Sequence, residues 1–289
     1  MAIRQILHTW MLGDRTLADI AGILLRIGAD GADLSINFEG GSNPERLLHQ
    51  DPKGIFSAAG LGVYSVSALY FHPDSDLSQP DKKAVRKAVD FTKQCVEVAV
   101  NAGCDRLLVS PSLISVRHHP HISYEEDWKR ARESLAEAAE YASQFGVMLM
   151  IEPINRYRVF LVHTLAEAKK MIDEIGKPNI KIVPDVYHMI MEETESVVTV
   201  LEKHSGDIAC LHLGDTARTV PGRGALDWNG IFSVLKKTGF DGPLSHEPII
   251  LYFDELRMGV DEGYAHHMEH LFSEGIAYVN SVMTTLGMR

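Results

Sequence analysis

Short apolar runs alternate with longer amphipathic segments along this chain, and eight of the runs have the length of a β-strand. The run VMLMI at positions 147–151 is apolar throughout, which is typical of a strand buried on both faces, as in a parallel sheet. The pattern therefore predicts an α/β fold. The eight predicted strands are Gln5–Thr9, Ala32–Ile36, Gly62–Ala68, Arg106–Ser110, Val147–Glu152, Ile180–Asp185, Ile208–His212 and Pro243–Glu247.

The segments between the predicted strands carry the start and stop signals of helices. Segments 81–103, 123–146 and 164–176 have apolar residues at three-to-four spacing, and each ends at a glycine. The second and third begin with Ser123 and Thr164, each followed three residues later by Glu, which is the capping-box pattern. A last helix is predicted from about residue 261 to residue 283, long enough to close the structure.

Eight βα units without a Gly/Ser-rich linker leave two architectures, a closed (β/α)8 barrel or an open, doubly wound sheet. An open sheet that binds dinucleotides has GxGxxG after its first strand, whereas this chain has HTWMLG at 8–13. We therefore predict a single TIM-barrel catalytic domain over residues 1–289. In such a barrel the functional residues lie at the C-terminal ends of the strands.

Composition narrows the class of protein further. The 289 residues carry a net charge of −11, which disfavours binding to the phosphates of nucleic acids. No run of about 18 apolar residues predicts a transmembrane helix, and the first residues lack the pattern of a signal peptide. Cys95, Cys104 and Cys210 are odd in number and show no CxxC spacing, as expected of reduced thiols. These features predict a cytoplasmic protein with no nucleic-acid or membrane partner.

The last four predicted strands end on residues that bind metals. They are Glu152, Asp185, His212 and Glu247, separated by 33, 27 and 35 residues, or one βα unit each. In a closed barrel these side chains point into a common mouth, where three carboxylates would repel one another unless a cation neutralised them. One such residue would be an ordinary polar strand end, but four in consecutive units predict a site for one divalent metal ion. The oxygen-rich ligands favour Mn²⁺, with Mg²⁺ or Co²⁺ as alternatives, while Zn²⁺ stays open.

Five short motifs surround these residues: EPINR at 152–156, DVYHM at 185–189, HLGDTAR at 212–218, PGRG at 221–224 with Trp228, and Glu247-Pro248. In these motifs the sequence resembles the xylose isomerase-like sugar isomerase/epimerase superfamily, and within it the D-tagatose 3-epimerase (ketose 3-epimerase) branch. The resemblance implies that Glu152, Asp185, His212 and Glu247 hold one divalent ion. It also implies that the substrate is a small sugar or sugar phosphate.

The resemblance also implies a reaction, the epimerisation of a ketose at C3. A ketose that chelates the metal loses the proton next to its polarised carbonyl, and inversion needs one base on each face of the resulting enediolate. Glu152 and Glu247 suit these two roles, because a carboxylate can bind metal with one oxygen and carry a proton on the other. His188 and Arg218 are implied to contact the oxygens of the sugar, and Arg218 would also stabilise the enediolate charge.

Several further residues are candidates for substrate contacts. Arg158 departs from the family pattern, because ketose 3-epimerases usually carry Glu at this position. A cation there favours an acidic substrate, with a solvated loop arginine as the alternative reading. Trp10 and His72 follow the first and third strands, where they would either wall the sugar or pack at the rim. The loop RHHPH at 117–121 would hold a phosphate or form a solvent-facing turn.

Other activities use the same set of ligands and stay open at this point. A hydroxypyruvate-type aldose–ketose isomerase would move the proton between C1 and C2 on the same ion, and an inosose-type dehydratase is a further relative. An AP-endonuclease-like nuclease shares several ligand types, but Asn229 stands where that family has a second histidine, and the acidic charge argues against it. Relatives are often dimers or tetramers, so a homodimer or a homotetramer is expected.

Overall fold

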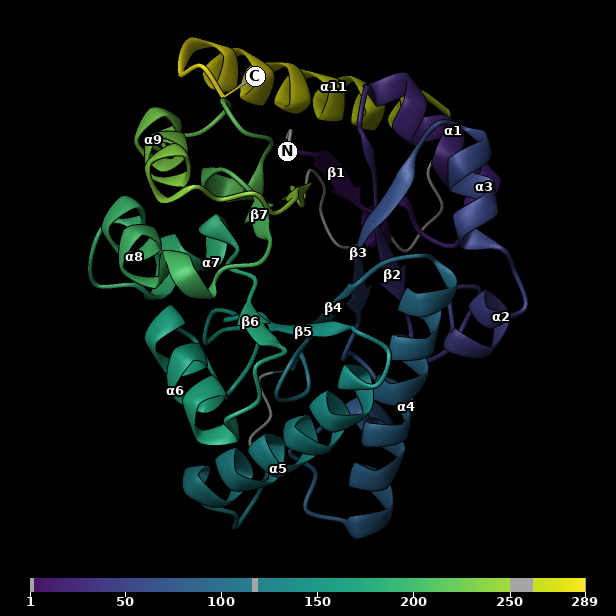
Figure 1. Cartoon of the computed structure of the whole chain (residues 1–289), viewed down its shortest axis with the longest axis vertical. Coiled ribbons are helices and arrows are strands. Elements are labelled where there is room, and N and C mark those ends of the chain that lie inside the picture. The colour runs from purple at the N-terminus through teal and green to yellow at the C-terminus, as the bar shows by residue number, and fades with distance from the viewer. Residues whose placement is uncertain (1–2, 116–118, 250–261, 289) are drawn as a thin grey trace.

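Eight parallel strands form the centre of the fold (Figure 1) in the computed structural model, which describes residues 3–115, 119–249 and 262–288 and, for residues 262–267, the backbone alone. Their order is β6-β5-β4-β3-β2-β1-β8-β7, and every pairing is parallel. The strands are β1 (Gln5–His8), β2 (Gly31–Ile36), β3 (Gly62–Ala68), β4 (Arg106–Val109), β5 (Met148–Ile151), β6 (Ile180–Ile182), β7 (Leu211–Leu213) and β8 (Leu244–His246).

Two isolated parallel bridges connect the ends of this sheet. One joins Ile182 to Ile208 and the other joins Asp185 to His212, and the amide of His212 donates to the carbonyl of Pro184 at 2.8 Å. These contacts close the sheet into the predicted barrel, so the doubly wound alternative is wrong. All eight predicted strands are present. The seventh begins later than predicted because the turn η3 (Ser205–Asp207) leaves Ile208 with only a bridge.

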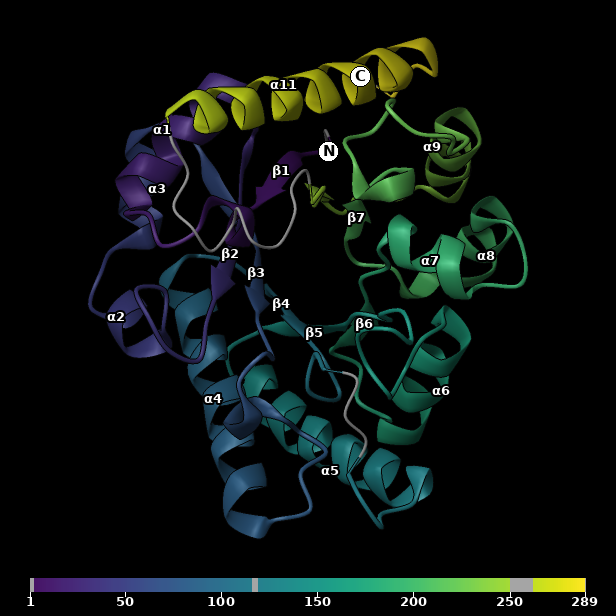
Figure 2. The ribbon, with the colours of Figure 1, turned by 180° about the vertical axis from the view of Figure 1, so that it is seen from behind.

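Helices surround the barrel in both ribbon views (Figures 1 and 2), and α11 lies beside α1. The two predicted capping boxes begin α5 and α6, and Asp81 caps α4. The helices are α1 (Leu17–Ile27), α2 (Pro44–Leu48), α3 (Pro52–Ala58), α4 (Lys82–Asn101), α5 (Tyr124–Ser143), α6 (Leu165–Ile175), α7 (Val186–Glu192), α8 (Val197–His204), α9 (Trp228–Thr238) and α11 (Glu262–Thr285); three further short turns are η1 (Thr9–Leu12), η2 (Pro73–Ser75) and η4 (Thr216–Arg218).

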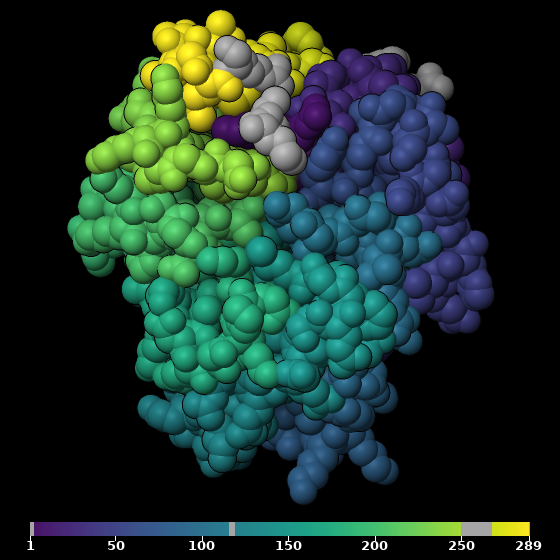
Figure 3. All heavy atoms as spheres, in the orientation of Figure 1, coloured from purple at the N-terminus to yellow at the C-terminus, as the bar shows by residue number. Residues whose placement is uncertain are grey.

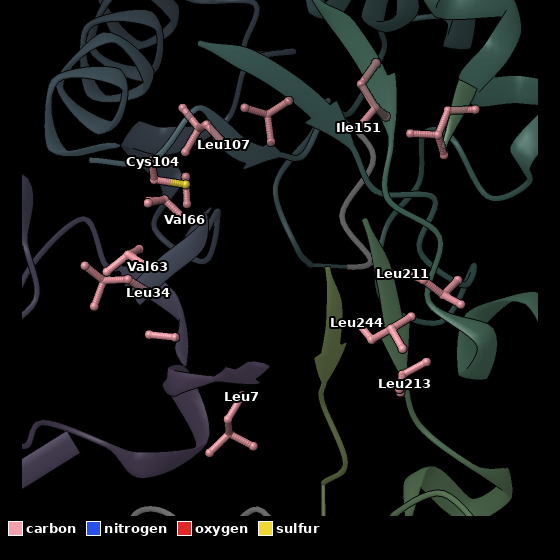
Figure 4. Packing of buried hydrophobic residues seen from close by; sticks show 14 of the residues in the cluster. Leu7, Leu34, Val63, Val66, Cys104, Leu107, Ile151, Leu211, Leu213 and Leu244 are labelled. Carbon is pink, nitrogen blue, oxygen red and sulfur yellow. The ribbon is translucent and has the colours of Figure 1, made fainter. Parts of the chain in front are cut away.

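Side chains alternate between the two faces of each strand, and the outward ones form the main core. Leucine and valine side chains of the strands pack in this layer, including Leu7, Val66 and Leu244 in Figure 4. A smaller apolar cluster consists of Leu108 on β4, Met150 on β5, Val183 just after β6 and Cys210 just before β7. Side chains fill the opening that the ribbon shows at the centre of the molecule (Figure 3).

The remaining strands carry buried polar side chains between their outward apolar ones. Asp33 of β2, Ser65 and Ser67 of β3 and Ser245 of β8 are all fully buried. The barrel interior is therefore polar along β2, β3 and β8, whereas β4 and β5 contribute the apolar Leu108 and Met150. Among the described helices, none combines the length and the apolar character needed to cross a bilayer.

Candidate functional site

The four residues predicted from the strand ends lie together in the barrel mouth. Nδ1 of His212 is 3.0 Å from Oε2 of Glu247 and 3.5 Å from Oε1 of Glu152. Ligand atoms of Glu152, Asp185 and His188 form a second group, and within each group of three all the atoms lie within 4.8 Å of one another. All five side chains are buried. The structure thus brings the predicted set together and places His188 beside it.

Local structure explains how each strand end presents its predicted metal ligand. Glu152 directly follows β5, and its amide donates to the carbonyl of Val109 on β4. Asp185 is the N-cap of α7, where Oδ1 accepts from the amide of Tyr187 at 2.9 Å and Oδ2 faces the site. Parallel pairing therefore places the carboxylates at one edge of the barrel.

The shared burial of these groups shifts their proton equilibria. Burial raises the pKa of Asp185 to about 7 against the opposing charge of Arg218, and Glu247 and Glu152 raise it further. Burial would also raise the pKa of Glu247, but Arg218, His8 and His212 together hold it well below its usual range. Carboxylates with such different affinities for a proton occupy one small volume, which is the setting in which a cation is stabilising.

The guanidinium of Arg218 contacts two carboxylates of this cluster. Its Nη2 lies 3.0 Å from Oε1 of Glu247 and 3.3 Å from Oδ2 of Asp185, and its guanidinium sits 5.1 Å from the centre of the Tyr187 ring. Ala217 and Arg218 both have left-handed backbones, with φ of 59° and 54°. This strained conformation turns the arginine side chain back into the barrel mouth.

Two further side chains orient groups in the cluster. Nε1 of Trp10 donates to Oε1 of Glu247 at 2.9 Å. Nδ2 of Asn155 donates to Nδ1 of His188 at 2.7 Å, which leaves the proton of the neutral imidazole on Nε2, 3.7 Å from Asp185. Burial, followed by the charge of Arg218, lowers the pKa of His188 well below its usual value. His188 is therefore a neutral hydrogen-bond donor in this site.

Asp33 supports the cluster from the opposite wall, and its role is not evident in the sequence motifs. Its Oδ1 accepts from the hydroxyl of Ser67 at 2.7 Å and its Oδ2 from the hydroxyl of Ser245 at 2.8 Å. Oδ2 also lies 3.3 Å from Nε2 of His212. The carboxylate of Asp33 favours an imidazole proton on Nε2, so that a metal ion bound to His212 would take Nδ1, the nitrogen that faces Glu152 and Glu247.

One pocket opens on the cluster, and a second lies beside it. The inner pocket measures about 40 Å³, and its lining includes Glu152, Glu247, His188, Trp10 and Phe71. The outer pocket measures about 390 Å³ and lies between the loop after β5, helix α7 and the turn η4. Arg158 and Arg218 line both pockets.

His72 is the one predicted substrate contact that lies away from these pockets. Its ring stacks on Phe38 with 4.3 Å between centroids, and its Nε2 is 3.5 Å from Oε1 of Glu39. Its Nδ1 accepts from the amide of Asp74, so it caps the turn η2. The geometry therefore gives no support to a substrate contact for His72 and favours the rim-packing alternative.

Residues 17–273 match the family model described as the xylose isomerase-like TIM barrel. The chain belongs to this family. It is 29% identical over 205 residues to a D-psicose 3-epimerase of Enterocloster bolteae, which covers 69% of this chain and 64% of that protein. It is 28% identical over 191 residues to an L-ribulose 3-epimerase of Mesorhizobium japonicum. This match covers 65% of this chain and 63% of that protein. The match thus spans just under two thirds of the length of these relatives.

A solved structure shows the same fold over nearly the whole chain. The D-psicose 3-epimerase from Clostridium cellulolyticum H10, crystallised with D-tagatose, has a TM-score of 0.83 at 20% identity and covers 97% of this chain and 99% of its own. At this identity the likeness establishes the barrel and says nothing of the substrate.

The motif at 212–228 of this xylose isomerase-like chain has a structural explanation. Oδ2 of Asp215 accepts from Nε1 of Trp228 at 2.7 Å and from the amide of Gly222 at 2.9 Å. Gly222 has φ of 90°, and a Cβ there would lie 2.6 Å from the ring of Tyr278 on α11. The aspartate, glycine and tryptophan of the motif thus fix the loop that carries Arg218.

The loop after β4 was a candidate phosphate site. Arg117 and His118 lie outside the described residues. His119 contacts two carboxylates instead, since its Nε2 is 3.2 Å from Oδ2 of Asp76 and its Nδ1 is 3.0 Å from Oδ1 of Asp127. Asp76 is the main cause of a raised pKa at His119, which burial opposes and Asp127 increases. The imidazole of His119 is thus already used by acidic partners.

Proposed function

We propose that this chain is a divalent-metal-dependent epimerase that inverts C3 of a ketose, a ketose derivative or a ketose phosphate. The observation that carries the proposal is that Glu152 and Glu247 both lie close to Nδ1 of His212, at 3.5 and 3.0 Å. The names of the curated relatives support the reaction type, and membership of the family supports the sugar as substrate class.

The donor set fits a hard divalent ion. The donor atoms of Glu152, His212 and Glu247 lie within 4.8 Å of one another, which is close enough for one ion to be held between them. Oε1 of Glu152 is buried without a hydrogen-bond partner, as expected of an atom reserved for a ligand. Glu152, Asp185, His212 and Glu247 would hold the ion, with Mn²⁺ as the first choice. When bound, the ion would polarise the carbonyl of the substrate and make the adjacent C–H acidic.

The two glutamates would then perform the proton transfers. One removes the proton from C3 on one face of the sugar, and the other delivers a proton to the opposite face. Trp10 holds Oε1 of Glu247 at 2.9 Å, which orients this carboxylate. If Oε1 of Glu152 binds the ion, the other oxygen of this carboxylate, Oε2, is left to carry the proton.

His188 and Arg218 would bind the oxygens of the substrate. Neutral His188 offers an N–H at Nε2, and Arg218 offers further donors next to the two glutamates. As the carbanion forms, negative charge develops on the former carbonyl oxygen. A fixed guanidinium stabilises that charge without reorganising.

The deciding experiment follows solvent deuterium into a panel of ketoses and ketose phosphates in the presence of Mn²⁺, read by NMR. Deuterium at C3 together with the C3 epimer is the expected result. Deuterium at C1 with an aldose as product would identify a hydroxypyruvate-type isomerase instead. Loss of water would identify an inosose-type dehydratase, and cleavage of abasic DNA would identify a nuclease.

Variants test the two-base scheme separately. Glu152→Gln and Glu247→Gln are each expected to lower the rate of deuterium exchange by about 10²- to 10⁴-fold. Glu195→Gln is the control, because Glu195 pairs with Lys203 on the surface. Turnover near the wild-type level in either active-site variant would refute the scheme.

Three further expectations from the sequence stay predictions. They are a homodimer or homotetramer, one catalytic domain over residues 1–289, and a cytoplasmic location. Sedimentation tests the oligomeric state.

A further inference from the structure

The inner and outer pockets share two arginines. The inner pocket measures about 40 Å³, roughly a tenth of the outer pocket at about 390 Å³. With the reacting end of the sugar assigned to the metal-ligand cluster, the remote end would extend past Arg158 and Arg218, which line both pockets, toward the outer pocket.

The charge along this route is positive. The described residues that line the outer pocket include Arg158 and Arg218 but no aspartate or glutamate. Arg218 already contacts Asp185 and Glu247, so its charge serves the metal-ligand cluster. Burial lowers the pKa of Arg158, and the charge of Arg218 lowers it further, although Glu247 acts in the opposite direction. An anion beside Arg158 would thus be stabilised by two guanidiniums.

Arg158 is also held in a defined place. Its amide donates to the carbonyl of Asn155 at 2.9 Å, and the side chain of Asn155 donates to His188. Its guanidinium lies 6.0 Å from the centre of the Phe71 ring, which lines the inner pocket. The turn that carries Arg158 is therefore tied to a proposed substrate-binding residue. A fixed guanidinium pairs with carboxylate or phosphate through two parallel hydrogen bonds.

We propose that the substrate is a sugar with a carboxylate or phosphate at the end remote from the carbon that loses its proton, and that Arg158 is the specificity-determining residue that binds this anion. The inference rests on the proposed function, since the reacting end is assigned to the metal-ligand cluster. The outer pocket, lined also by Tyr157, Tyr187 and Met191, accommodates the anionic end.

The test compares three substrates that share a reacting end: a neutral ketohexose, its 6-phosphate and the corresponding 6-carboxylate. The value of kcat/KM for deuterium exchange is measured for wild type, Arg158→Gln, Arg158→Lys and the control Arg223→Gln. The control Arg223→Gln removes the same charge from the loop after β7. Arg223 itself pairs with Glu274 and lines neither pocket. Calorimetric titration with the neutral sugar and the 6-phosphate measures binding without turnover.

Wild type is expected to prefer one anionic substrate over the neutral one by about 10-fold or more, and the preferred anion identifies phosphate or carboxylate. Arg158→Gln should lower the ratio of anionic to neutral kcat/KM by about 30-fold, Arg158→Lys should lower it less, and Arg223→Gln should leave it unchanged. A wild-type ratio of one or below, or a ratio that Arg158→Gln does not change, overturns the proposal. If no substrate exchanges, the proposed function fails, and the binding titrations still decide whether Arg158 recognises an anion.

Discussion

Replacing Asp33 is predicted to weaken metal binding although Asp33 is not itself a ligand. Asp33 is fully buried and lies 3.3 Å from Nε2 of His212. A metal bound at Nδ1 of His212 requires the imidazole proton on Nε2, and a carboxylate at that nitrogen holds it there and makes Nδ1 more basic. Without Asp33 the ring is free to turn or to change its tautomer. The affinity for Mn²⁺ should therefore fall while the four ligands stay in place.

The size of the effect follows from the contacts that are lost. Partners of this kind typically contribute 10- to 100-fold to metal affinity, or about 1.4 to 2.8 kcal/mol. Asp33→Asn keeps one oxygen acceptor, so its loss of metal affinity should be about 10-fold, the lower limit. Asp33→Ala leaves the hydroxyls of Ser67 and Ser245 and the N–H of His212 without this acceptor, so it should lie near the upper limit.

Calorimetric titration of the metal-free protein with Mn²⁺ measures the effect, and circular dichroism checks that each variant is folded. Asp76→Asn is the matched control, because Asp76 is equally buried and accepts from a serine hydroxyl, Ser78 Oγ at 2.6 Å, but contacts His119 rather than His212. A folded Asp33→Ala protein with a Kd within about threefold of wild type would refute the reasoning. A loss of Mn²⁺ affinity in Asp76→Asn equal to that in the Asp33 variants would also refute it.

Three further outcomes are expected. Trp10→Phe removes the N–H that orients Glu247, and the deuterium-exchange rate should fall about 10-fold, with an unchanged rate as the contrary result. Gly222→Ala should lower the free energy of unfolding by about 1 to 3 kcal/mol more than Gly40→Ala, measured in urea, because both glycines have φ of 90° but a Cβ at Gly40 meets nothing within 4 Å. The raised pKa of His119 stabilises the fold at low pH, and this contribution disappears as the pH rises through that pKa. His119→Gln should therefore be more destabilising at about pH 5.5 than at about pH 9, and equal losses would contradict this.

Much of the fold follows from local sequence signals. The capping boxes at Ser123 and Thr164 begin α5 and α6, and the continuous apolar run at 147–151 contains β5, because these features act within a few residues. The four predicted metal ligands could also be found from the sequence, since each lies at the end of one of four successive predicted strands. Their proximity needs only the rule that parallel strands end at the same edge of a barrel.

The supporting contacts of the site could not be predicted in this way, because they join distant segments. Trp10 and Glu247 are 237 residues apart, and no sequence motif contains both of them. A signal for Asp33 did exist. Asp33 and Ser35 alternate with apolar residues in β2, as Ser65 and Ser67 do in β3, and this period of two indicates a polar inner face. The sequence does not show which ligand this face supports.

The contact between Asp33 and His212 also shows why the closed barrel matters for the site. Asp33 is on β2 and His212 on β7, and the sheet order places β1 and β8 between them. With strands about 4.8 Å apart, three intervals in a flat sheet would separate these residues by about 14 Å. Their side chains meet at 3.3 Å because the sheet curls into a barrel and both point inward. An open sheet would still have strand ends with acidic residues, but His212 would lose the carboxylate that fixes its tautomer. Closure of the barrel therefore does more than bury the core: it brings the polar wall of β2, β3 and β8 against the ligand on β7.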